Sequence, residues 1–420
     1  MLQKQSRKLP IGMTSLIMIG MIAGMIFGVV ADQSFEALVV IGQIFLRLIQ
    51  MSIILLVMGQ IIEAVGGIKP AESGKIGLKT VTVFLVSTML AAAFGLLITT
   101  IIQPGGSINL ERIDQSTEGI SEQNLKIGDT VLSFFPVNVI GSMANGVIVQ
   151  VILFAILFGL SLSLVIQDND GEGTNLLSLI SSFNKTIMTL VRLVMKLAPI
   201  GVFALVASSI GEYGIEMILP LAKYLGTFAF ATALFLGIWI VVVCLYARVP
   251  LFGLLYGVSR MSTVALATTS SAVTLPTEME DAETRLGISK EISRIVLPLG
   301  VSLNSNGAAM HMAITILTIA QLYGVTYGFN DYLYIVVLAT FASLANAVVP
   351  GAGLVSLSIV VPQMGLPLES IAIFAGVEWF VGMIRTIANV DTDTFSAILV
   401  AKSEGKLDTS VYQLARAETA

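Results

Sequence analysis

Long apolar runs alternate with short polar stretches along most of the chain. Before Pro250, six of these runs are long enough to cross a hydrocarbon core of about 30 Å, which takes roughly 20 helical residues. They are Ile11–Val30, Ala37–Val65, Thr80–Gln103, Val131–Ile166, Thr186–Ile210 and Met217–Ala247. The fourth run is too long for one span and contains Pro136 and Asn145-Gly146, so we expect a broken helix there. The pattern predicts an all-α membrane protein.

After Pro250 the pattern changes to two segments that each consist of an apolar stretch, a small polar tip and a return. The first runs through Leu251–Ala267, a tip at Thr268–Pro276 and Thr277–Leu286; the second runs through Tyr332–Ala347, a tip at Val348–Gly353 and Leu354–Met364. Each arm is too short to span the bilayer at 1.5 Å per residue, so the pattern predicts two re-entrant hairpins. Such backbone must be covered by protein or line a water-filled cavity.

Each predicted hairpin is followed by an apolar run with polar residues at its middle. Asn304-Ser305-Asn306-Gly307 interrupts Ile292–Leu322, and the stretch from Arg385 to Asp393 interrupts Ile371–Ala401. A hairpin followed by a broken helix therefore occurs twice. Paired interrupted segments of this kind mark the binding site of secondary transporters, near the middle of the membrane.

The composition supports membrane insertion and excludes several other classes. Hydrophobic residues make up 55% of the 420 residues and charged residues 12%, whereas a soluble domain has about 45–50% apolar residues. The formal net charge of −5 is spread over the loops and points to no partner. The only cysteine, Cys244, excludes a disulfide framework and a thiolate metal cluster.

Basic residues are distributed unequally between the loops. Lys69, Lys75 and Lys79 lie after the second run and Arg248 after the sixth, whereas residues 31–36 and 211–216 contain no lysine or arginine. By the positive-inside rule, both termini lie in the cytoplasm and the long polar loop 104–129 lies outside. The first run is interpreted as a retained helix rather than a signal peptide, because more spans follow it. We expect a multi-pass protein of a bacterial-type inner membrane.

Four charged residues interrupt the last apolar run. They are Glu378, Arg385, Asp391 and Asp393, and at roughly 2.5–3.5 kcal/mol each they cost on the order of 10 kcal/mol to insert. The Arg385 guanidinium is a planar fork suited to a carboxylate; the alternative is an ion pair with Glu378 or Asp391. Asn389 follows Arg385 by four residues and Asp393 by eight, so these side chains share one helical face.

Other polar residues in the second half suit anion or cation binding. A helix beginning after Ser270-Ser271 would attract an anion, and broken backbone at Asn304, Asn306 and Gly307 would expose carbonyl oxygens that suit Na⁺. The alternative for the second feature is a simple kink. The only histidine, His311, can relay protons or pack as a hydrogen-bonded residue, and we favour packing.

These residues resemble those of the dicarboxylate/amino acid:cation symporter family, the glutamate transporter homologues, over nearly the whole chain. The matching stretches are Lys196 to Leu205, Thr274-Leu275-Pro276, Leu297-Pro298-Leu299-Gly300, Val349-Pro350-Gly351-Ala352-Gly353, and Arg385-Thr386 through Asn389 to Asp393. The resemblance implies eight transmembrane helices plus two re-entrant hairpins, an elevator fold with inverted repeats, and a homotrimer. It implies no enzyme activity and no cofactor besides coupling Na⁺ or H⁺.

The resemblance also implies a division of the chain. Residues 1–249 would be mainly scaffold and trimerisation helices, with the third and sixth spans joining the transport domain. Residues 250–405 would form the transport core, and residues 406–420 a cytoplasmic tail.

The implied substrate site holds a small anionic solute through residues of both hairpins and the last two broken helices. Its residues would be Ser270, Ser271, Ala308, Val349, Gly353, Gly382, Arg385, Thr386 and Asn389. Arg385 would bind the distal carboxylate, Asn389 and the serine tip the other carboxylate, and the 349–353 tip would act as the gate.

Three cation sites are implied in the same way. Asp393 with carbonyls of Gly300, Asn304 and Asn389 resembles one sodium site. Ser302 with the backbone from Ser343 to Asn346 resembles a second, and Ser87, Thr88, Asn304 and Asn306 resemble a third.

Two departures from the family's pattern change the expected chemistry. Asn306 stands where the family has an Asp in its third cation site, and Phe84 replaces a Tyr, so we expect fewer coupled Na⁺ ions or partial replacement by protons. Gly382 stands where amino acid carriers have the Asp that binds the amine, and Thr269 matches dicarboxylate carriers. These residues favour a C4-dicarboxylate slightly over an acidic amino acid, although Thr386 and Asp393 match the amino acid carriers.

Two further readings stay open. A neutral or sulfur-containing amino acid:cation symporter would have the same fold, and a gated anion channel would share the polar broken helices. An intramembrane hydrolase is disfavoured, because it requires Ser, His and Asp in mutual reach or a metal, and the chain has a single histidine.

Overall fold

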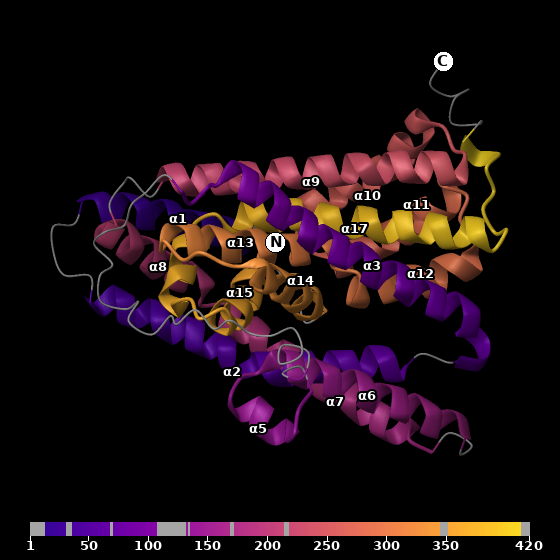
Figure 1. Cartoon of the computed structure of the whole chain (residues 1–420), viewed down its shortest axis with the longest axis horizontal. Coiled ribbons are helices and arrows are strands. Elements are labelled where there is room, and N and C mark those ends of the chain that lie inside the picture. Colours follow the sequence, from indigo (N-terminus) through magenta and orange to yellow (C-terminus); the bar gives the residue numbers. More distant parts are fainter. Residues whose placement is uncertain are drawn as a thin grey trace, which may run out of the picture.

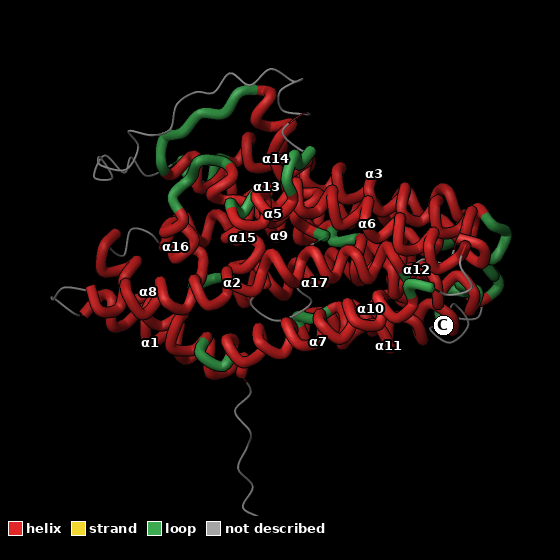
Figure 2. Tube along the Cα trace, turned by 90° about the horizontal axis from the view of Figure 1, so that it is seen from below, coloured by secondary structure: helices red, strands yellow, loops and turns green. Residues whose placement is uncertain are grey.

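A computed structural model of the chain describes residues 13–30, 36–67, 70–106, 132, 135–168, 172–213, 218–344 and 352–412. Among these residues the regular structure is helical, and Figure 2 shows no strand. One isolated bridge pairs Ile288 with Leu407. The predicted all-α class is therefore confirmed for the described part of the chain.

The first half of the chain forms long helices. They are α1 (Met13–Val30), α2 (Glu36–Gly66), α3 (Pro70–Ile102), α5 (Val139–Ala144), α6 (Ile148–Asp168), α7 (Thr174–Met195), α8 (Ala198–Tyr213) and α9 (Ile218–Ala247). The second half is divided more finely. It contains α10 (Leu251–Thr268), α11 (Ser271–Thr284), α12 (Lys290–Leu303), α13 (Asn306–Leu322), α14 (Phe329–Ser343), α15 (Ala352–Gln363), η2 (Leu368–Ser370), α16 (Ile371–Ala375) and α17 (Glu378–Ser403).

By length and composition, five of the described helices can cross a membrane. The segments are Lys75–Ile102, Val149–Asp168, Thr174–Met195, Leu219–Ala247 and Leu251–Thr268. The last is α10, the first arm of the first predicted hairpin, and its 18 residues extend for about 27 Å at 1.5 Å per residue. It therefore comes close to the thickness of the hydrocarbon core before the chain turns back into α11.

The helices pack in two groups. In the first, α1 lies along α8, and α2 packs against α6, α7 and α8. In the second, α3 and α9 join the helices that follow Pro250: α3 packs on α13 and α14, and α9 on α17 (Figure 1). Helix α15 lies between them, because it contacts both α13 and α2. The third and sixth predicted spans thus accompany the second half of the chain.

Three glycines let α1 approach α8 closely. Gly20, Gly24 and Gly28 are spaced four residues apart, so they lie along one face of α1. A Cβ atom on them would come within 2.4, 2.7 and 2.8 Å of backbone carbonyl oxygens of α8, which are also four residues apart. Small residues at such spacing let membrane helices pack backbone against backbone.

The predicted fifth run, Thr186–Ile210, is not one continuous helix. Helix α7 ends at Met195 and α8 begins at Ala198. Pro199 explains the break, because it has no N–H to donate to the Met195 carbonyl four residues earlier. The fourth run is broken as predicted: α5 ends before Asn145, and Gly146 has a φ of +71°. Of the predicted outer loop 104–129, residues 107–129 lie outside the described part of the chain.

The backbone turns at the predicted tip of the first hairpin and at the predicted break around Asn304. The predicted break between Arg385 and Asp393 is wrong, because α17 runs without interruption from Glu378 to Ser403 and the chain is broken earlier, at Gly376 and Val377. Thr269 and Ser270 separate α10 from α11, and Asn304 and Ser305 separate α12 from α13. The second hairpin consists of α14 and α15, which contact each other, and its tip lies outside the described residues. Pro276, predicted in the first tip, lies inside α11 instead, because the turn is complete at Ser270.

The end of α17 is joined to the connection between α11 and α12. Beside the Ile288–Leu407 bridge, the backbone N–H of Asp408 donates to the Gly287 carbonyl at 2.8 Å, and that of Ser289 donates to the Lys406 carbonyl at 3.1 Å. Hairpin 1, defined here as α10 and α11, is thereby tied by main-chain hydrogen bonds to the segment that follows the last helix.

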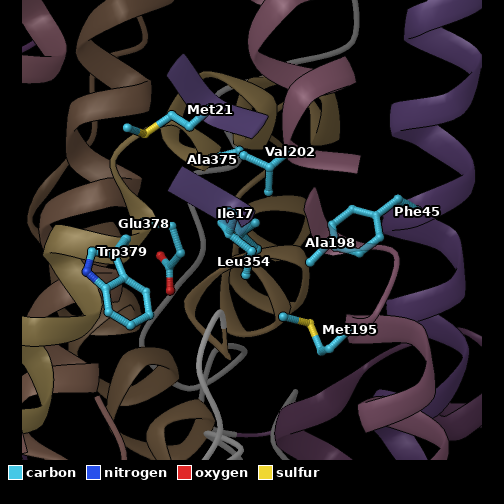
Figure 3. A pocket seen from close by; sticks show the side chains of 10 residues that line it. All are labelled: Ile17, Met21, Phe45, Met195, Ala198, Val202, Leu354, Ala375, Glu378 and Trp379. Carbon is cyan, nitrogen blue, oxygen red and sulfur yellow. The ribbon is translucent and has the colours of Figure 1, made fainter. Parts of the chain in front are cut away.

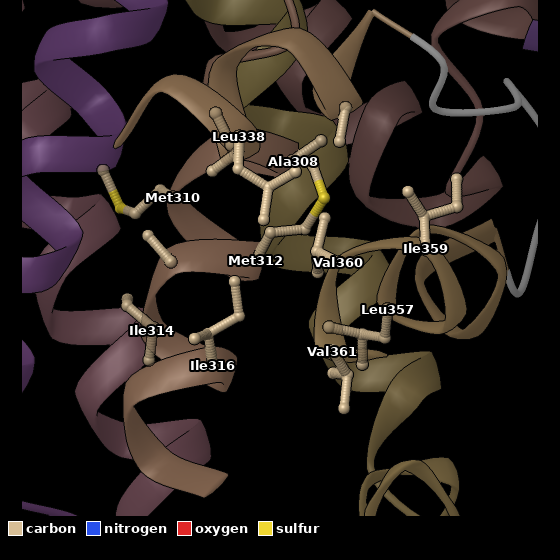
Figure 4. Close-up of a cluster of buried hydrophobic side chains, with 14 of the residues drawn as sticks. Ala308, Met310, Met312, Ile314, Ile316, Leu338, Leu357, Ile359, Val360 and Val361 are labelled. Atoms are coloured by element: carbon tan, nitrogen blue, oxygen red, sulfur yellow. The ribbon is translucent and has the colours of Figure 1, made fainter. Parts of the chain in front are cut away.

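Helix α13 is buried on every side for almost its whole length. Its methionines and isoleucines pack against Leu338 of α14 and against Leu357, Val360 and Val361 of α15 (Figure 4). A helix that is apolar all round requires neighbours on all faces. The polar break that precedes α13 is therefore held inside protein.

Candidate functional site

Helix α17 carries most of the polar residues of the site. Glu378, Arg385, Thr386, Asn389 and Asp393 are all buried, and Arg385 has only 3% of its surface exposed. Hairpin 1 and the α12–α13 break pack against this helix. The structure thus brings together residues from segments more than 100 positions apart.

Arg385 forms an ion pair with Glu378, one of the two partners considered from the sequence. Both terminal nitrogens of Arg385 donate to Glu378 Oε1 at 3.1 Å, and the backbone N–H of Gly353 donates to the same oxygen at 2.9 Å. A Cβ atom at position 353 would lie 2.2 Å from Arg385 Nη1. A larger residue at this position of the second hairpin would therefore displace the Arg385–Glu378 pair.

Gly382 leaves free space beside the same guanidinium. A Cβ atom placed on it would be 3.7 Å from Arg385 Nη2 and 3.9 Å from Thr269 Cβ. Arg385 and the tip of hairpin 1 therefore meet at Gly382, which itself supplies no carboxylate to pair with an amine. The predicted site residue Thr386 turns its hydroxyl to its own helix, donating to the Gly382 carbonyl at 2.7 Å.

The hairpin 1 tip is buried and tightly turned. Thr269 has a φ of +50°, a left-handed conformation that ends α10, and its buried hydroxyl has no hydrogen-bond partner. Ser270 caps α11 by accepting from the Val273 N–H at 3.4 Å. Because the first N–H groups of a helix favour negative charge, Ser270 and Ser271 mark an anion-attracting end.

The α12–α13 break forms a hydroxyl and amide cluster with α3. The Ser87 hydroxyl lies 2.9 and 3.2 Å from the side-chain oxygens of Asn304 and Asn306 and can donate to either, and Thr88 donates to that of Asn306 at 2.7 Å. Across the break, the Gly307 N–H donates to Asn389 Oδ1 at 2.8 Å. The four residues of the third predicted cation site are therefore in mutual contact.

Asp393 lies at the other side of the same break. Its Oδ1 accepts from Asn304 Nδ2 at 2.7 Å, while its buried Oδ2 has no hydrogen-bond partner. A Cβ atom on Gly300 would be only 2.6 Å from the Asp393 carboxyl carbon. Three of the residues of the first predicted cation site, Gly300, Asn304 and Asp393, thus converge.

The second predicted cation site is not brought together in the described residues. The Ser302 side chain is exposed, and the buried Ser343 hydroxyl donates to the Thr340 carbonyl at 2.7 Å. Asn346 and the substrate-site residue Val349 lie outside the described residues. Ala308, also predicted for the substrate site, is 1% exposed at the start of α13.

His311 packs among aromatic rings. Its ring centre lies 5.6 Å from that of Phe228 and 6.5 Å from that of Tyr224. The aromatic surroundings agree with the predicted packing, but the predicted hydrogen bond is wrong, because neither ring nitrogen has a hydrogen-bond partner among the described residues. Tyr224 OH instead pairs with the Thr315 hydroxyl at 2.8 Å.

Two buried carboxylates near the site were not predicted as site residues. Glu278 of α11 accepts from the Thr394 hydroxyl at 3.0 Å, and Asp391 accepts from the Ser262 hydroxyl at 2.7 Å. Asp391 was considered only as a possible partner of Arg385. The sequence signal for Glu278 is its position in a hairpin arm flanked by membrane helices, where an acidic residue is costly.

A small cavity opens beside Glu378 at the contact between the two helix groups. Its volume is about 30 Å³, and Figure 3 shows Glu378 and Leu354 on one side with residues of α1 and α8 around them. The other lining residues are Ile17, Met21, Phe45, Met195, Ala198, Val202, Ala375 and Trp379. The lining is mostly apolar, and among the described residues the hydrogen bonds to Glu378 come from Arg385 and from the Gly353 N–H.

Residues 13–403 match the model of the sodium:dicarboxylate symporter family. The chain belongs to the sodium:dicarboxylate symporter family. The match covers the helices that carry the site and both hairpins, and the membership predicted from the sequence is confirmed. Proteins of this family are transporters and not enzymes, in agreement with the prediction.

Individual members of the sodium:dicarboxylate symporter family align over most of the chain. A proton/sodium-glutamate symport protein of Bacillus subtilis (strain 168) is 31% identical over 424 residues, covering 98% of this chain and 96% of the relative. A C4-dicarboxylate transport protein of Laribacter hongkongensis (strain HLHK9) is 28% identical, covering 96% and 92%. A proton/glutamate-aspartate symporter of Escherichia coli (strain K12) is 30% identical, covering 87% and 85%.

Proposed function

We propose that the protein is a secondary active symporter that couples uptake of a small acidic solute to inward flow of Na⁺, H⁺ or both. The observation that carries this proposal is the buried Arg385, whose guanidinium lies between α15 and the tip of hairpin 1. A buried cation at the meeting point of two hairpins suits an anionic solute. The named glutamate and C4-dicarboxylate carriers among the relatives support the same class of solute.

Solute binding replaces one carboxylate on Arg385 by another. Glu378 neutralises the guanidinium in the solute-free protein, and the solute's distal carboxylate takes over part of this pairing. The second carboxylate is held by Asn389 and by the helix end at Ser270 and Ser271. The tip at Val349 to Gly353 closes over the site.

A C4-dicarboxylate is slightly favoured over an acidic amino acid. Next to Arg385, Gly382 provides space but no negative charge for an amine. Leaving a buried ammonium group without its partner costs roughly 2–5 kcal/mol, or about thirtyfold to several-thousandfold in affinity. A neutral or sulfur-containing amino acid has no distal carboxylate to pair with Arg385. This solute class is therefore the weaker alternative.

The cations bind at the α12–α13 break. The first site uses Asp393 with backbone carbonyls of Gly300, Asn304 and Asn389, and the third uses Ser87, Thr88, Asn304 and Asn306. The contacts of Asn304 with both Ser87 and Asp393 support a shared role in these two sites. Ser302 and the 343–346 backbone form the second site when the second hairpin closes.

The two groups of helices correspond to two functional units that move by an elevator mechanism. Residues 250–405 with α3 and α9 form the transport core, and the remaining helices of residues 1–249 form a scaffold that assembles into a homotrimer. The packing of α3 and α9 on the later helices supports this division. The protein is placed in a bacterial-type inner membrane with both termini and residues 406–420 in the cytoplasm.

Uptake by proteoliposomes tests the proposal. Labelled succinate and aspartate are compared side by side, with an imposed Na⁺ gradient or an imposed pH gradient. Concentrative uptake of succinate driven by either gradient is expected. Uptake of aspartate without succinate would reverse the preferred solute, and passive equilibration with no accumulation under any gradient would favour a gated anion channel.

A further inference from the structure

Glu278 is a buried carboxylate that the proposed sites do not use. It lies in α11, two turns after the tip of hairpin 1, and its surface is 0% exposed. Its Oε1 accepts from the Thr394 hydroxyl at 3.0 Å, and its Oε2 is buried without a hydrogen-bond partner. One of the two Glu278 carboxylate oxygens therefore accepts no hydrogen bond from the described residues.

The basic residues near this arm are paired elsewhere. Arg260 contacts Glu280 at 2.9 Å and Asp281 at 3.3 Å, and Arg285 contacts Asp281 at 3.5 Å. No ion pair found among the described residues involves Glu278. Its negative charge is thus left without a counter-charge from the described part of the chain.

Glu278 meets α17 in a stretch that contains two more buried carboxylates, Asp391 and Asp393. Thr394, its hydrogen-bond partner, directly follows Asp393 in the chain, so Glu278 contacts α17 at the residue next to Asp393. Asp393 Oδ2 is, like Glu278 Oε2, buried without a partner. Each of the three carboxylates accepts from one neutral group of another segment.

Such a group requires positive charge from outside the chain. Buried carboxylates are strongly unfavourable unless they are paired or coordinate a metal ion. The cluster of Ser87, Thr88 and Asn306 on the other side of the break is neutral. Electrostatics therefore draws a cation toward Glu278 and Asp393, where carboxylate and hydroxyl oxygens provide hard ligands.

We propose that Glu278 is a sodium ligand, and that it holds one Na⁺ together with Asp393 between hairpin 1 and α17. The proposal rests on the proposed cation-coupled transport and adds a ligand from hairpin 1 to it. Because Glu278 and the serine tip are on one helix, Na⁺ at Glu278 fixes α11 against α17. Sodium binding then orders the helix end that receives the solute carboxylate.

Sodium binding by the purified full-length protein tests the proposal without any transport measurement. NaCl is titrated into Na⁺-free protein by calorimetry, with choline maintaining ionic strength, for the wild type, Glu278→Gln and Glu280→Gln. Glu280 is exposed on the same helix and provides the matched control. We expect Glu278→Gln to weaken Na⁺ binding roughly thirtyfold or more, and Glu280→Gln to leave it unchanged.

The outcomes separate this inference from the proposed function. Equal Na⁺ affinity in Glu278→Gln and the wild type would overturn the role of Glu278 while leaving Na⁺-coupled transport intact, and a change only in pH dependence would overturn it in favour of a proton. Absence of Na⁺ binding by the wild type would overturn both. If Glu278→Gln does not fold, Glu278→Asp is measured instead. This variant keeps the negative charge, but its shorter side chain moves the carboxylate oxygens away from the proposed Na⁺ position. An unchanged Na⁺ affinity in Glu278→Asp would also overturn the proposal.

Discussion

The carboxylate of Glu378 accepts hydrogen bonds from both terminal nitrogens of Arg385, each at 3.1 Å, through one oxygen. The same oxygen accepts from the Gly353 N–H, at the start of α15. The solute-free arrangement therefore connects the arginine to the second hairpin. If the proposed solute carboxylate binds Arg385, it would compete with Glu378 for the guanidinium and would alter the contact between Glu378 and the second hairpin.

Replacing Glu378 by Gln removes the competing charge. The solute-free protein should lose stability, because removing one partner of a buried ion pair costs about 3–5 kcal/mol. Succinate should then bind more tightly and raise the apparent Tm by more than it does in the wild type. Glu404→Gln, at the C-terminal end of the same helix, is the control. A smaller succinate-induced Tm shift in Glu378→Gln than in the wild type would contradict the competition.

Arg385→Lys tests whether the guanidinium binds the solute. Lysine keeps the charge but cannot form two parallel hydrogen bonds with one carboxylate. Succinate uptake into proteoliposomes should fall at least tenfold, a change of about 1.4 kcal/mol, and Arg385→Ala should abolish it. Normal uptake by Arg385→Ala would exclude the proposed role of this side chain.

Gly382→Asp should shift the selectivity toward aspartate. The new Cβ has room beside Arg385 Nη2 and Thr269, and the carboxylate supplies the partner that an amine lacks. The ratio of aspartate to succinate affinity should rise by roughly thirtyfold or more, measured by competition for uptake. Gly382→Asn has the same shape without the charge and should not change the ratio. An equal ratio of aspartate to succinate affinity in Gly382→Asp and Gly382→Asn would show that a carboxylate at position 382 does not determine the selectivity.

Asn306→Asp should strengthen Na⁺ binding. The Asn306 Oδ1 accepts from Ser87 and Thr88, while its Nδ2 has no partner, so an Asp adds charge without losing a hydrogen bond. An increase of about tenfold in Na⁺ affinity, or about 1.4 kcal/mol, is expected in calorimetry.

Asn304→Asp is the matched comparison for that experiment. Asn304 Nδ2 donates to Asp393 Oδ1 at 2.7 Å, and an Asp at position 304 would place two carboxylates against each other. In Na⁺-free buffer this variant should be less stable than Asn306→Asp. If Asn304→Asp and Asn306→Asp changed the stability in Na⁺-free buffer equally, the proposed difference between the surroundings of Asn304 and Asn306 would be wrong.

Gly24→Ala should weaken the contact between α1 and α8. The added Cβ would lie 2.7 Å from the Phe203 carbonyl oxygen, so the helices must separate, at a cost of about 1–3 kcal/mol. Gly237→Ala in α9 is the control, because no atom lies within 4 Å of its Cβ position. The apparent Tm in detergent should fall for Gly24→Ala only. A similar Tm in both variants would show that the close approach contributes little.

Some of the breaks in the helices were predictable from local chemistry, but the predicted break between Arg385 and Asp393 is absent from α17. Pro, Gly and Asn interrupt membrane runs through missing donors and exposed carbonyls, and the predicted interruption at Asn304 is present in the structure. The break before Ala198 was missed, although Pro199 accounts for it. Family membership also followed from the sequence, since several specific stretches agree at once.

Contacts between distant segments were less predictable. Glu278 and Thr394 are 116 residues apart, and no spacing rule indicates that they meet. The glycine series in α1 has a recognisable four-residue spacing, but its partner in α8 depends on tertiary packing. Pairing of Arg385 with Glu378 rather than Asp391 likewise depends on side-chain direction along α17.

The Ile288–Leu407 bridge limits how the molecule can be deformed. Together with the hydrogen bonds from Asp408 to Gly287 and from Ser289 to Lys406, it joins the end of hairpin 1 to the end of α17 through the main chain. A force that displaces one of these elements is transmitted to the other without relying on side chains. If Arg385 moves across the bilayer during transport, as proposed, Ser270 and Ser271 would move with it, and any surface along which the two groups of helices slide would lie outside hairpin 1 and α17.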